Sequence, residues 1–446
     1  MGGSVSSLSR RSSVSQKDIQ AIQEALQKQQ KISSQVVLAL LVLIPPSTFV
    51  YFYSISLHNG EFLSTLKPLF YQYPFIFRCI PPIFDLTAWK FTIIHCAMQL
   101  ILYWGLPHDK AIVLSSEGEE IRDINSFFSC ILTCLLYILG VSAGFYRGDV
   151  LYEHFNSIIL IFAMFSLLIL TYLILIYHFG NDYEITTANE LYFGIERHPK
   201  FLDIDLKYFI RTRFTFVIWP LYIISALYSQ KILYGKISNS LLCLSSLQLF
   251  YIAKFHWSED LYLNSLDSKH SNCGFYRLWT DLVWHPILYT TPVTVLSRSN
   301  RSLRTISNLI FSILSIILIA LTERIDRQKY EFRKCKGDMK IKGFDSFFIT
   351  AKYKTDSGDA KANLLLGSGY WSLSRHPNYV SEAATFLIFT AFQGFPSICA
   401  YTPAFFITGF LIARAITDEN RCMAKYGQNW IQYCSKVKYR FLPGVY

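Results

Sequence analysis

The chain has 446 residues, 52% of them hydrophobic, and a mean hydropathy of +0.28. Its length alone would fit two or three soluble domains, but this composition excludes an ordinary soluble protein and indicates a polytopic membrane protein. The formal charge of +11 lies mainly in the N-terminal arm, the loop after residue 323 and the C-terminal tail. That distribution favours the cytosolic flanks of a membrane protein over a nucleic-acid partner.

The N-terminal arm, residues 1–33, is rich in Ser, Gln and Lys and is predicted to be disordered and cytosolic. It lacks the short apolar core of a cleaved signal peptide. The opening M-G-G-S-V-S fits the M-G-x-x-x-S pattern for N-myristoylation of Gly2. An integral membrane protein needs no lipid anchor, so both interpretations of Gly2 stay open.

Ten apolar runs follow the arm, and we expect each to be a transmembrane helix, because a backbone in lipid must form its own hydrogen bonds. The runs cover residues 34–56, 89–106, 125–146, 155–178, 213–230, 238–256, 276–297, 303–322, 383–398 and 400–416. Residues 57–88, 107–124, 179–212 and 323–363 are predicted to be loops. The fold class predicted is all-α, a polytopic transmembrane helical bundle of about ten spans. An even number of spans puts both termini and the basic loop 323–363 on one side, which the charge rule makes cytosolic.

Polar residues are unusually frequent between residues 247 and 289, within or next to apolar sequence. They include Tyr251, Lys254, His256, Glu259, Asp267, His270 and Asp281. Ionisable groups in a membrane are costly and generally face a cavity. A Tyr beside Asp and His side chains can donate a proton, whereas the structural alternative is a hydrogen-bonded network that only joins packed helices. Asp281 and His285-Pro286 further indicate that the span at 276–297 is broken or lines a cavity.

A second polar group lies at the ends of the last two spans. It consists of Arg375, His376, Asn378 and Tyr379 before the first span, and Arg414, Asp418, Arg421 and Lys425 after the second. The intervals of four, three and four place the latter set on one side of a helix. With Trp371, Tyr379 and Tyr426, these cations could hold a phosphate-bearing cofactor that contains a ring. The alternative is the Lys- and Arg-rich flank expected at the cytosolic end of a membrane hairpin.

Two common kinds of site are excluded by the sequence pattern. No G-x-G-x-x-G follows a strand-like run, so a Rossmann nucleotide site is not predicted. The ten cysteines form no C-x-x-C pair and no zinc-like spacing with histidine, so no metal site is predicted.

Several motifs at fixed spacing resemble the sterol reductase family, which includes the C14- and C7-reductases of sterol synthesis and the membrane part of the lamin B receptor. They are G-Y-W at 369–371, R-H-P-N-Y at 375–379, D at 418, R-C at 421–422, K-Y-G at 425–427 and Y-R-F-L-P at 439–443. The resemblance covers about residues 185–446. Trp257 and the L-Y-L at 261–263 favour a resemblance to the C7-reductases over the C14-reductases.

The resemblance implies a multi-pass protein of the endoplasmic reticulum membrane that uses NADPH to reduce a sterol ring double bond. The delta-7 bond is the first candidate. It implies a sterol substrate within the lipid bilayer and other sterol-synthesis enzymes as candidate partners. The implied cofactor contacts are Lys329, Arg333, Leu366, Trp371, Asn378, Tyr379, Arg414, Asp418 and Tyr426. Tyr251 is the implied proton donor, with Asp418 tuning or relaying, and Glu259, Asp267 and His270 are implied proton relays or cation-stabilising groups.

On this basis the chain is predicted to have four parts. After the arm come N-terminal spans at 34–184, a substrate-pocket region at 185–322 and a cofactor-binding region with a membrane hairpin at 323–446, whose cofactor part is cytosolic. Lys329 and Arg333, one helical turn apart, are predicted to continue the helix that ends its apolar part near Thr322 and to meet the adenosine-side phosphate.

Departures from the family pattern keep other functions open. Lys254 stands where relatives have Asp and would oppose a developing cation, and Ser271 replaces the Asp of a His-Asp pair. The alternatives are a delta-14 reductase, a sterol-binding protein with reduced or no catalysis, and a methyltransferase using S-adenosylmethionine that shares R-H-P-x-Y. The Lys329 and Arg333 pair argues against the methyltransferase.

Overall fold

The structure is a computed structural model, and it describes residues 33–58, 79–114, 118–180, 187–354, 358, 360–396 and 398–445. The predicted arm with Gly2 and most of the predicted loop 57–88 lie outside the described residues.

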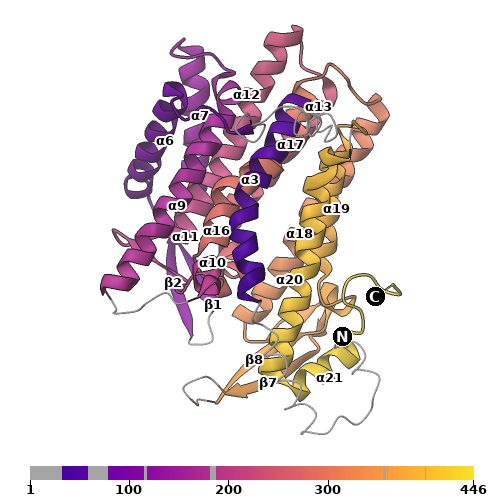
Figure 1. The fold of residues 1–446 in the computed structure, drawn as a ribbon. Helices are drawn as coiled ribbons and strands as arrows, with labels where there is room; N and C mark the ends of the chain where they lie inside the picture. Colours follow the sequence, from indigo (N-terminus) through magenta and orange to yellow (C-terminus); the bar gives the residue numbers. More distant parts are fainter. Residues whose placement is uncertain are drawn as a thin grey trace.

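Long helices form the body of the molecule and confirm a mostly helical fold (Figure 1). They are α3 (Ser34–His58), α6 (Leu86–Gly105), α7 (Ser126–Ser142), α9 (Phe155–Gly180), α12 (Phe216–Tyr234), α13 (Asn239–Trp257), α17 (His285–Ser297), α18 (Thr305–Lys334), α19 (Pro377–Ala391) and α20 (Thr402–Tyr426). Shorter helices are α8 (Val150–Glu153), α10 (Ala188–Phe193), α11 (Leu206–Phe209), α14 (Glu259–Leu263), α15 (Leu266–His270), α16 (Phe275–Trp279) and α21 (Gln428–Lys436). Each of the ten predicted runs therefore overlaps one long helix.

Among the described residues, five stretches of helix are long and apolar enough to cross a membrane, judged by length and composition. They are Ser34–Leu57, Phe155–Phe179, Leu206–Tyr234, Thr305–Lys334 and Cys399–Tyr426. Large apolar side chains such as Val42, Leu43, Ile316 and Ile317 are exposed on their outer faces, as lipid-facing residues are. A multi-pass membrane protein follows from these helices, while the number of ten spans stays a prediction.

The core lies where α9, α12, α13 and α17 pack together. Trp219 and Tyr222 of α12 are almost fully buried there, and the Tyr222 ring lies 4.1 Å from the Phe155 ring, centroid to centroid. Aromatic side chains bury a large apolar area each, so they dominate the packing of such a core.

Two π-helical segments interrupt this core and contact each other. Segment η1 (Ile210–Thr215) leads into α12, and η2 (Thr280–Trp284) leads into α17. The predicted break in the run 276–297 is therefore confirmed. Such wide turns are frequent at functional sites, and here they bring Arg211 and Asp281 into an ion pair of 2.6 Å.

Four two-stranded antiparallel hairpins correct the prediction of an all-α fold. They pair β1 (Asp109–Leu114) with β2 (Glu119–Ile124), β3 (Lys200–Phe201) with β4 (Ile204–Asp205), β5 (Lys340–Ile341) with β6 (Phe344–Asp345), and β7 (Phe348–Lys354) with β8 (Ala360–Leu366). The predicted loops 107–124 and 323–363 were interpreted from their charges. In β7, however, buried Ile349 and Ala351 alternate with exposed Thr350 and Lys352, which is the period of a strand with one buried face.

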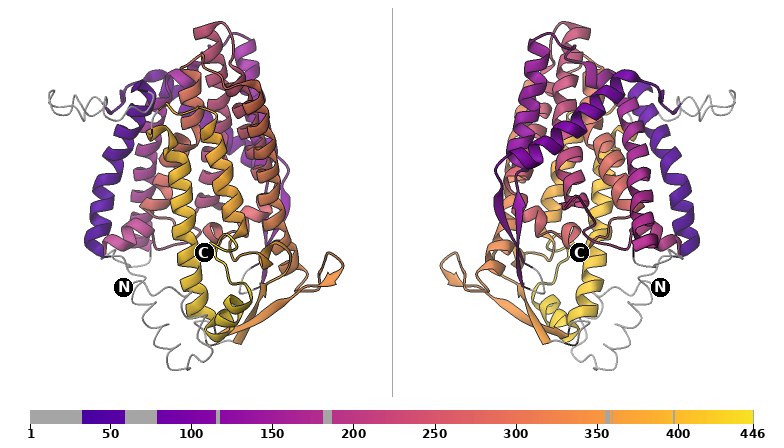
Figure 2. Two further views of the ribbon diagram at one scale, coloured as in Figure 1. Left: turned by 90° about the vertical axis from the view of Figure 1, so that its right-hand side faces the viewer. Right: turned by 90° about the vertical axis from the view of Figure 1, so that its left-hand side faces the viewer.

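The C-terminal part extends beyond the apolar helices. As predicted for Lys329 and Arg333, α18 continues past Thr322 to Lys334, and α20 continues past the predicted end at 416 to Tyr426. Gly427, with a positive φ of 50°, then turns the chain into α21. Figure 2 shows α21 and the β7–β8 hairpin gathered at one end of the bundle, where they share a small core with Met423, Trp430 and Tyr433.

Candidate active site

A cavity of about 1330 Å3 lies between α13, α18, α19 and α20 and extends to the hairpins β1–β2 and β7–β8. All predicted site residues except Glu259 line it: Tyr251, Asp267, His270, Lys329, Arg333, Leu366, Trp371, Asn378, Tyr379, Arg414, Asp418 and Tyr426. The fold therefore brings residues from widely separated parts of the chain to one enclosed space, which is the general form of a ligand site.

Glu259 is placed apart from this cavity. Its side chain is 1% exposed, accepts a short hydrogen bond from the Tyr208 hydroxyl, and accepts the Ser126 N–H at 3.4 Å. Burial raises the pKa of its carboxyl, although hydrogen bonds from Tyr208 and Ser126 oppose that shift. This position joins α14 to α7 and α11, so the geometry favours a packing role for Glu259 over the predicted relay.

One wall of the cavity is cationic and aromatic. The Lys329 ammonium lies 4.2 Å from the centre of the Trp371 ring, and Trp371 is fixed by donating its indole N–H to the Ile325 carbonyl at 3.1 Å. Leu366 and Trp371 are buried together in a small cluster at the end of α18. The Tyr426 hydroxyl, farther along α20, accepts a hydrogen bond of 2.9 Å from the Asn363 amide. A cation over an aromatic ring next to an open space suits a planar, anionic ligand.

Arg414 connects this wall to the part of the cavity that holds Asp267. Its guanidinium lies 3.1 Å from the Asp267 carboxylate and 5.4 Å from the centre of the Tyr379 ring. Burial opposes ionisation of Asp267, but the charges of Arg414, Arg277 and Arg211 outweigh it and hold the pKa of its carboxyl below the usual range. Asp267 is therefore an anion at neutral pH that positions Arg414.

His270 faces the same cavity as a neutral group. Burial lowers its pKa to about 3, and the nearby charges of Arg421, Arg197 and Lys425 act in the same direction. At neutral pH the imidazole therefore carries no charge and can exchange hydrogen bonds, but it does not stabilise a cation by its charge.

Four buried polar atoms on the cationic wall have no hydrogen-bond partner among the described residues: Arg333 Nε, Asn378 Oδ1, Arg414 Nε and Arg421 Nη1. A buried polar atom without a partner is costly, so these atoms indicate a ligand that satisfies them. Three N–H donors of guanidinium groups match phosphate oxygens, and an amide oxygen matches the N–H of a carboxamide. The residues present therefore fit a phosphate-bearing dinucleotide.

The Tyr251 side chain extends from α13 into the cavity toward α19. Its hydroxyl donates a short hydrogen bond to Glu382 of α19, and its ring packs against Trp219 and Phe386 at centroid distances of 5.8 and 5.7 Å. The Asp418 carboxylate instead accepts a hydrogen bond of 3.1 Å from the Arg421 guanidinium, on the cationic wall. Sequence reasoning missed Glu382, although an acidic residue three positions after Tyr379 in an otherwise apolar run was a usable signal.

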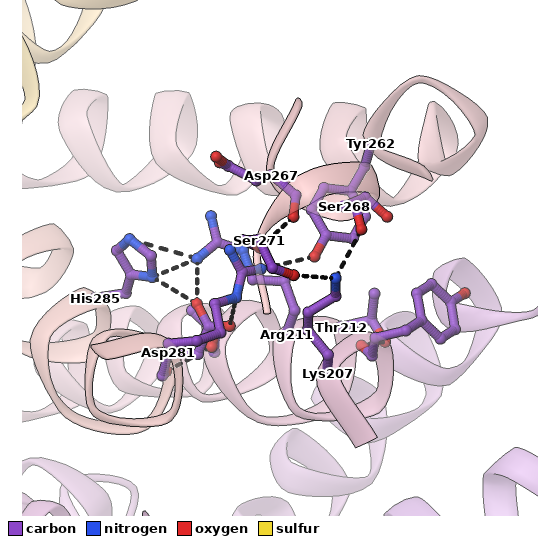
Figure 3. A network of polar contacts seen from close by, with 12 residues as sticks. Lys207, Arg211, Thr212, Tyr262, Asp267, Ser268, Ser271, Asp281 and His285 are labelled. Carbon is purple, nitrogen blue, oxygen red and sulfur yellow. Dashed lines mark hydrogen bonds and ion pairs between the residues drawn. The ribbon is translucent and has the colours of Figure 1, made fainter. Parts of the chain in front are cut away.

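A buried network of charges lies beside the cavity, where Arg211, Arg277 and His285 line it (Figure 3). The Asp281 carboxylate accepts from Arg211 at 2.6 Å and pairs with Arg277 at 2.7 Å, and it lies 3.1 Å from the His285 ring. Beside it, the Lys207 ammonium donates to the Ser268 and Ser271 carbonyls at 2.7 and 2.9 Å. Arg211 and Arg277 also line the cavity and were not predicted. Arg211 lies 70 residues from its partner Asp281 in sequence, whereas Arg277 is four residues from Asp281 and that spacing was a usable signal.

Arg375 has a structural partner that its sequence position did not reveal. The Glu419 carboxylate, which is fully buried, accepts from Arg375 at 2.7 Å and from Arg440 at 2.7 Å. Arg375 also donates to the Val437 and Lys438 carbonyls at 2.9 and 2.8 Å. These contacts, here called the tail clamp (Arg375, Glu419 and Arg440), hold the segment after α21 against α19 and α20.

Comparison with known proteins identifies similar chains. A model described as the ergosterol biosynthesis ERG4/ERG24 family matches residues 24–446. A protein of Arabidopsis thaliana named 7-dehydrocholesterol reductase is 31% identical over 92% of this chain and 96% of its own length. A delta(14)-sterol reductase of Mus musculus is 28% identical over 78% of this chain and 83% of its own length. A delta(14)-sterol reductase of Methylotuvimicrobium alcaliphilum is 25% identical over 92% of this chain and 94% of its own length. The similarity therefore includes every residue that lines the cavity.

Proposed function

The chain belongs to the ergosterol biosynthesis ERG4/ERG24 family of sterol reductases, and on that premise we propose that it reduces a sterol ring double bond with NADPH. The observation that carries this proposal is the single cavity that joins the Tyr251 hydroxyl to a cationic wall with unsatisfied donors. The bond that we propose is delta-7, because the relative that is 31% identical is named a 7-dehydrocholesterol reductase. The endoplasmic reticulum membrane and other sterol-synthesis enzymes are the proposed location and partners.

The cationic wall is the proposed NADPH site. Lys329 and Arg333, one turn apart on α18, suit the phosphate that distinguishes NADPH from NADH, and Trp371 and Tyr379 offer ring faces. Asn378 and Arg414 bring unsatisfied amide and guanidinium atoms to the same wall. When bound, NADPH supplies the hydride that no side chain of the protein can supply.

The protein supplies the proton and the surroundings of the reacting bond. Tyr251 donates its hydroxyl proton to one carbon of the double bond, so that its neighbour becomes electron-deficient. Tyr289 lines the cavity and presents an aromatic ring there, and such a ring stabilises positive charge. Lys254, which would oppose that charge, has its ammonium 3.8 Å from the Glu323 carboxylate, so its field at the substrate is partly offset.

The test is expression in yeast strains that accumulate either 5,7-diene or 14-ene sterols, with products identified by mass spectrometry. We expect the 5,7-diene to be converted to the 5-ene and the 14-ene to be unchanged. Conversion of the 14-ene alone would establish the delta-14 alternative. Good expression without any sterol conversion in either strain would reject the reductase proposal and favour a sterol-binding protein.

Lys269 is expected to make NADPH binding depend on pH. Burial, together with the charges of Arg333 and Lys329, lowers the pKa of Lys269 to about 7. A bound phosphate favours the charged ammonium and raises that pKa again, so affinity is highest below this pH and falls as the pH rises through it, by up to about tenfold per pH unit.

The measurement is a fluorescence titration of the detergent-solubilised protein with NADPH, from about pH 6.5 to about pH 8.5. This range is chosen because the phosphate of NADPH is already mostly ionised there and contributes little pH dependence of its own. Lys269→Met is the matched variant, and it should bind NADPH more weakly at the low end and lose the pH dependence. A Lys269→Met protein with the wild-type slope would show that another group titrates.

A further inference from the structure

The Tyr251 hydroxyl is held by a carboxylate of the facing helix. Tyr251 of α13 and Glu382 of α19 both line the cavity, and the hydroxyl donates its hydrogen bond to Glu382 Oε1. Tyr251 is 9% exposed, and aromatic rings of Trp219, Phe386 and Phe389 surround its ring at centroid distances of 5.7 to 6.2 Å. A proton that leaves this hydroxyl therefore leaves a buried phenolate in contact with the Glu382 carboxyl group.

An unpaired phenolate in such surroundings is strongly disfavoured, so proton donation by Tyr251 needs a proton that arrives as the first one leaves. The group in contact with the hydroxyl is the one placed to deliver it. A neutral carboxyl of Glu382 can donate to the phenol oxygen, and a carboxylate there cannot.

Several charged and titratable side chains surround Glu382 and its partner Tyr251. The charged and titratable side chains that face Glu382 or its Tyr251 partner are Lys254 of α13, Arg211 of η1, Tyr289 of α17 and Asp326 of α18. Asp326 accepts the Asn378 amide at 2.8 Å and lies close enough to Glu382 for the two negative charges to repel each other. Glu382 and Asp326 are thus two acidic side chains on neighbouring helices, and Glu382 is the one in contact with Tyr251.

A supply of protons from outside is also present. A second cavity of about 630 Å3 lies on the outer side of α13 and α18, and Lys254, Ser258 and Glu323 line both cavities. Glu323 accepts the Ser258 hydroxyl at 2.7 Å, while its second oxygen has no hydrogen bond among the described residues. Polar side chains of α13 and α18 thus face both cavities.

We propose that Glu382 positions Tyr251 and restores its proton in each turnover, a role that rests on the proposed reductase function. In the relay the hydrogen bond between Tyr251 and Glu382 runs in the opposite sense: a protonated Glu382 donates to the phenol oxygen, and the hydroxyl proton of Tyr251 is directed at the sterol. The O–H bond of Tyr251 then breaks as the C–H bond forms on the sterol, and the O–H bond of Glu382 breaks as its proton moves to the phenol oxygen. Glu382 becomes a carboxylate and regains a proton from solvent past Asp326. No electrons move in this relay, because the reduction is completed by hydride from NADPH.

The test compares Glu382→Gln, Glu382→Asp and wild type in the purified full-length protein, with sterol turnover, sterol KM, NADPH affinity and the pH dependence of turnover measured for each. Glu382→Gln keeps the hydrogen bond but cannot supply a proton, so turnover should fall by about 100-fold, the scale of general acid catalysis, with NADPH affinity and sterol KM unchanged. Glu382→Asp should recover most of the rate with a shifted pH profile.

Glu196→Gln is the matched control, because Glu196 accepts a Tyr177 hydroxyl at 2.5 Å outside the cavity. It should leave turnover unchanged. A Glu382→Gln protein with wild-type turnover and pH profile overturns the relay while the reductase function stands. If Glu382→Gln fails to bind NADPH, the Glu382→Asp variant is the test of the relay. Wild-type turnover with an unshifted pH profile in Glu382→Asp would overturn the relay. A turnover in Glu382→Asp as low as that of a preparation without the protein would also overturn the relay. A wild-type protein that reduces no sterol rejects the proposed function itself, and the relay with it.

Discussion

Tyr251→Phe protein is expected to bind NADPH normally and to reduce sterol at a rate lowered by roughly 10²–10⁴-fold, the contribution of a positioned general acid. The substitution removes the hydroxyl and its hydrogen bond to Glu382, and the ring contacts with Trp219 and Phe386 are kept. Protonation of a carbon–carbon double bond needs an acid in contact with it, and Phe offers none. Purified wild-type and variant proteins should be compared by sterol mass spectrometry and by NADPH titration.

Tyr137→Phe provides the matched control for the loss of a buried tyrosine hydroxyl. Tyr137 is 5% exposed and donates to the Gly148 carbonyl at 2.9 Å, in α7 and away from the cavity. This variant should lose some stability and keep its turnover per folded molecule. Near-normal turnover in Tyr251→Phe would instead assign the proton to another group on the cavity.

Glu419→Gln is expected to destabilise the protein by about 3–5 kcal/mol, the cost of leaving buried charges without their partner. The tail clamp places one fully buried carboxylate between Arg375 and Arg440, and the neutral amide removes that negative charge from beside both guanidinium groups. The free energy of unfolding should be compared with wild type by denaturant or thermal unfolding in detergent. Limited proteolysis should show earlier cleavage in the segment after Lys436.

The control for this variant is Glu331→Gln on the partly exposed side of α18, which should change stability by no more than about 0.5 kcal/mol. An unfolding curve of Glu419→Gln that superimposes on wild type would mean that water or another anion replaces the carboxylate. Because Arg375 of the tail clamp also lines the cavity proposed to bind NADPH, weaker NADPH binding should accompany the loss of stability in Glu419→Gln and not in Glu331→Gln.

Helices could be predicted from the sequence where apolar runs are long, because such runs leave the backbone few alternatives. Every predicted run overlaps a helix, and the continuation of α18 to Arg333 followed from one pair of cations one turn apart. The β7–β8 hairpin was missed because Lys352 and Lys354 made a polar loop the simplest interpretation. Its buried face is set by α21, a partner that comes about 75 residues later in the chain.

The candidate site was predictable as a set of positions and not as a set of contacts. The motif resemblance identified the predicted residues that line the cavity. It also included Glu259, because a motif does not distinguish a carboxylate that packs in the protein interior from one that faces a ligand. Pairs such as Tyr251 and Glu382, 131 residues apart, or Arg375 and Glu419, 44 residues apart, depend on how helices pack. No local pattern encodes those distances.

The position of the tail clamp in the chain has a consequence for biosynthesis. Its last member, Arg440, comes after all the long helices, so a growing polypeptide inserts its apolar segments before the clamp can close. The ion pairs of the tail clamp therefore form last, after translation has passed α21. A chain whose synthesis stops before Arg440 would have its long helices and lack the contacts that join the segment after α21 to α19 and α20.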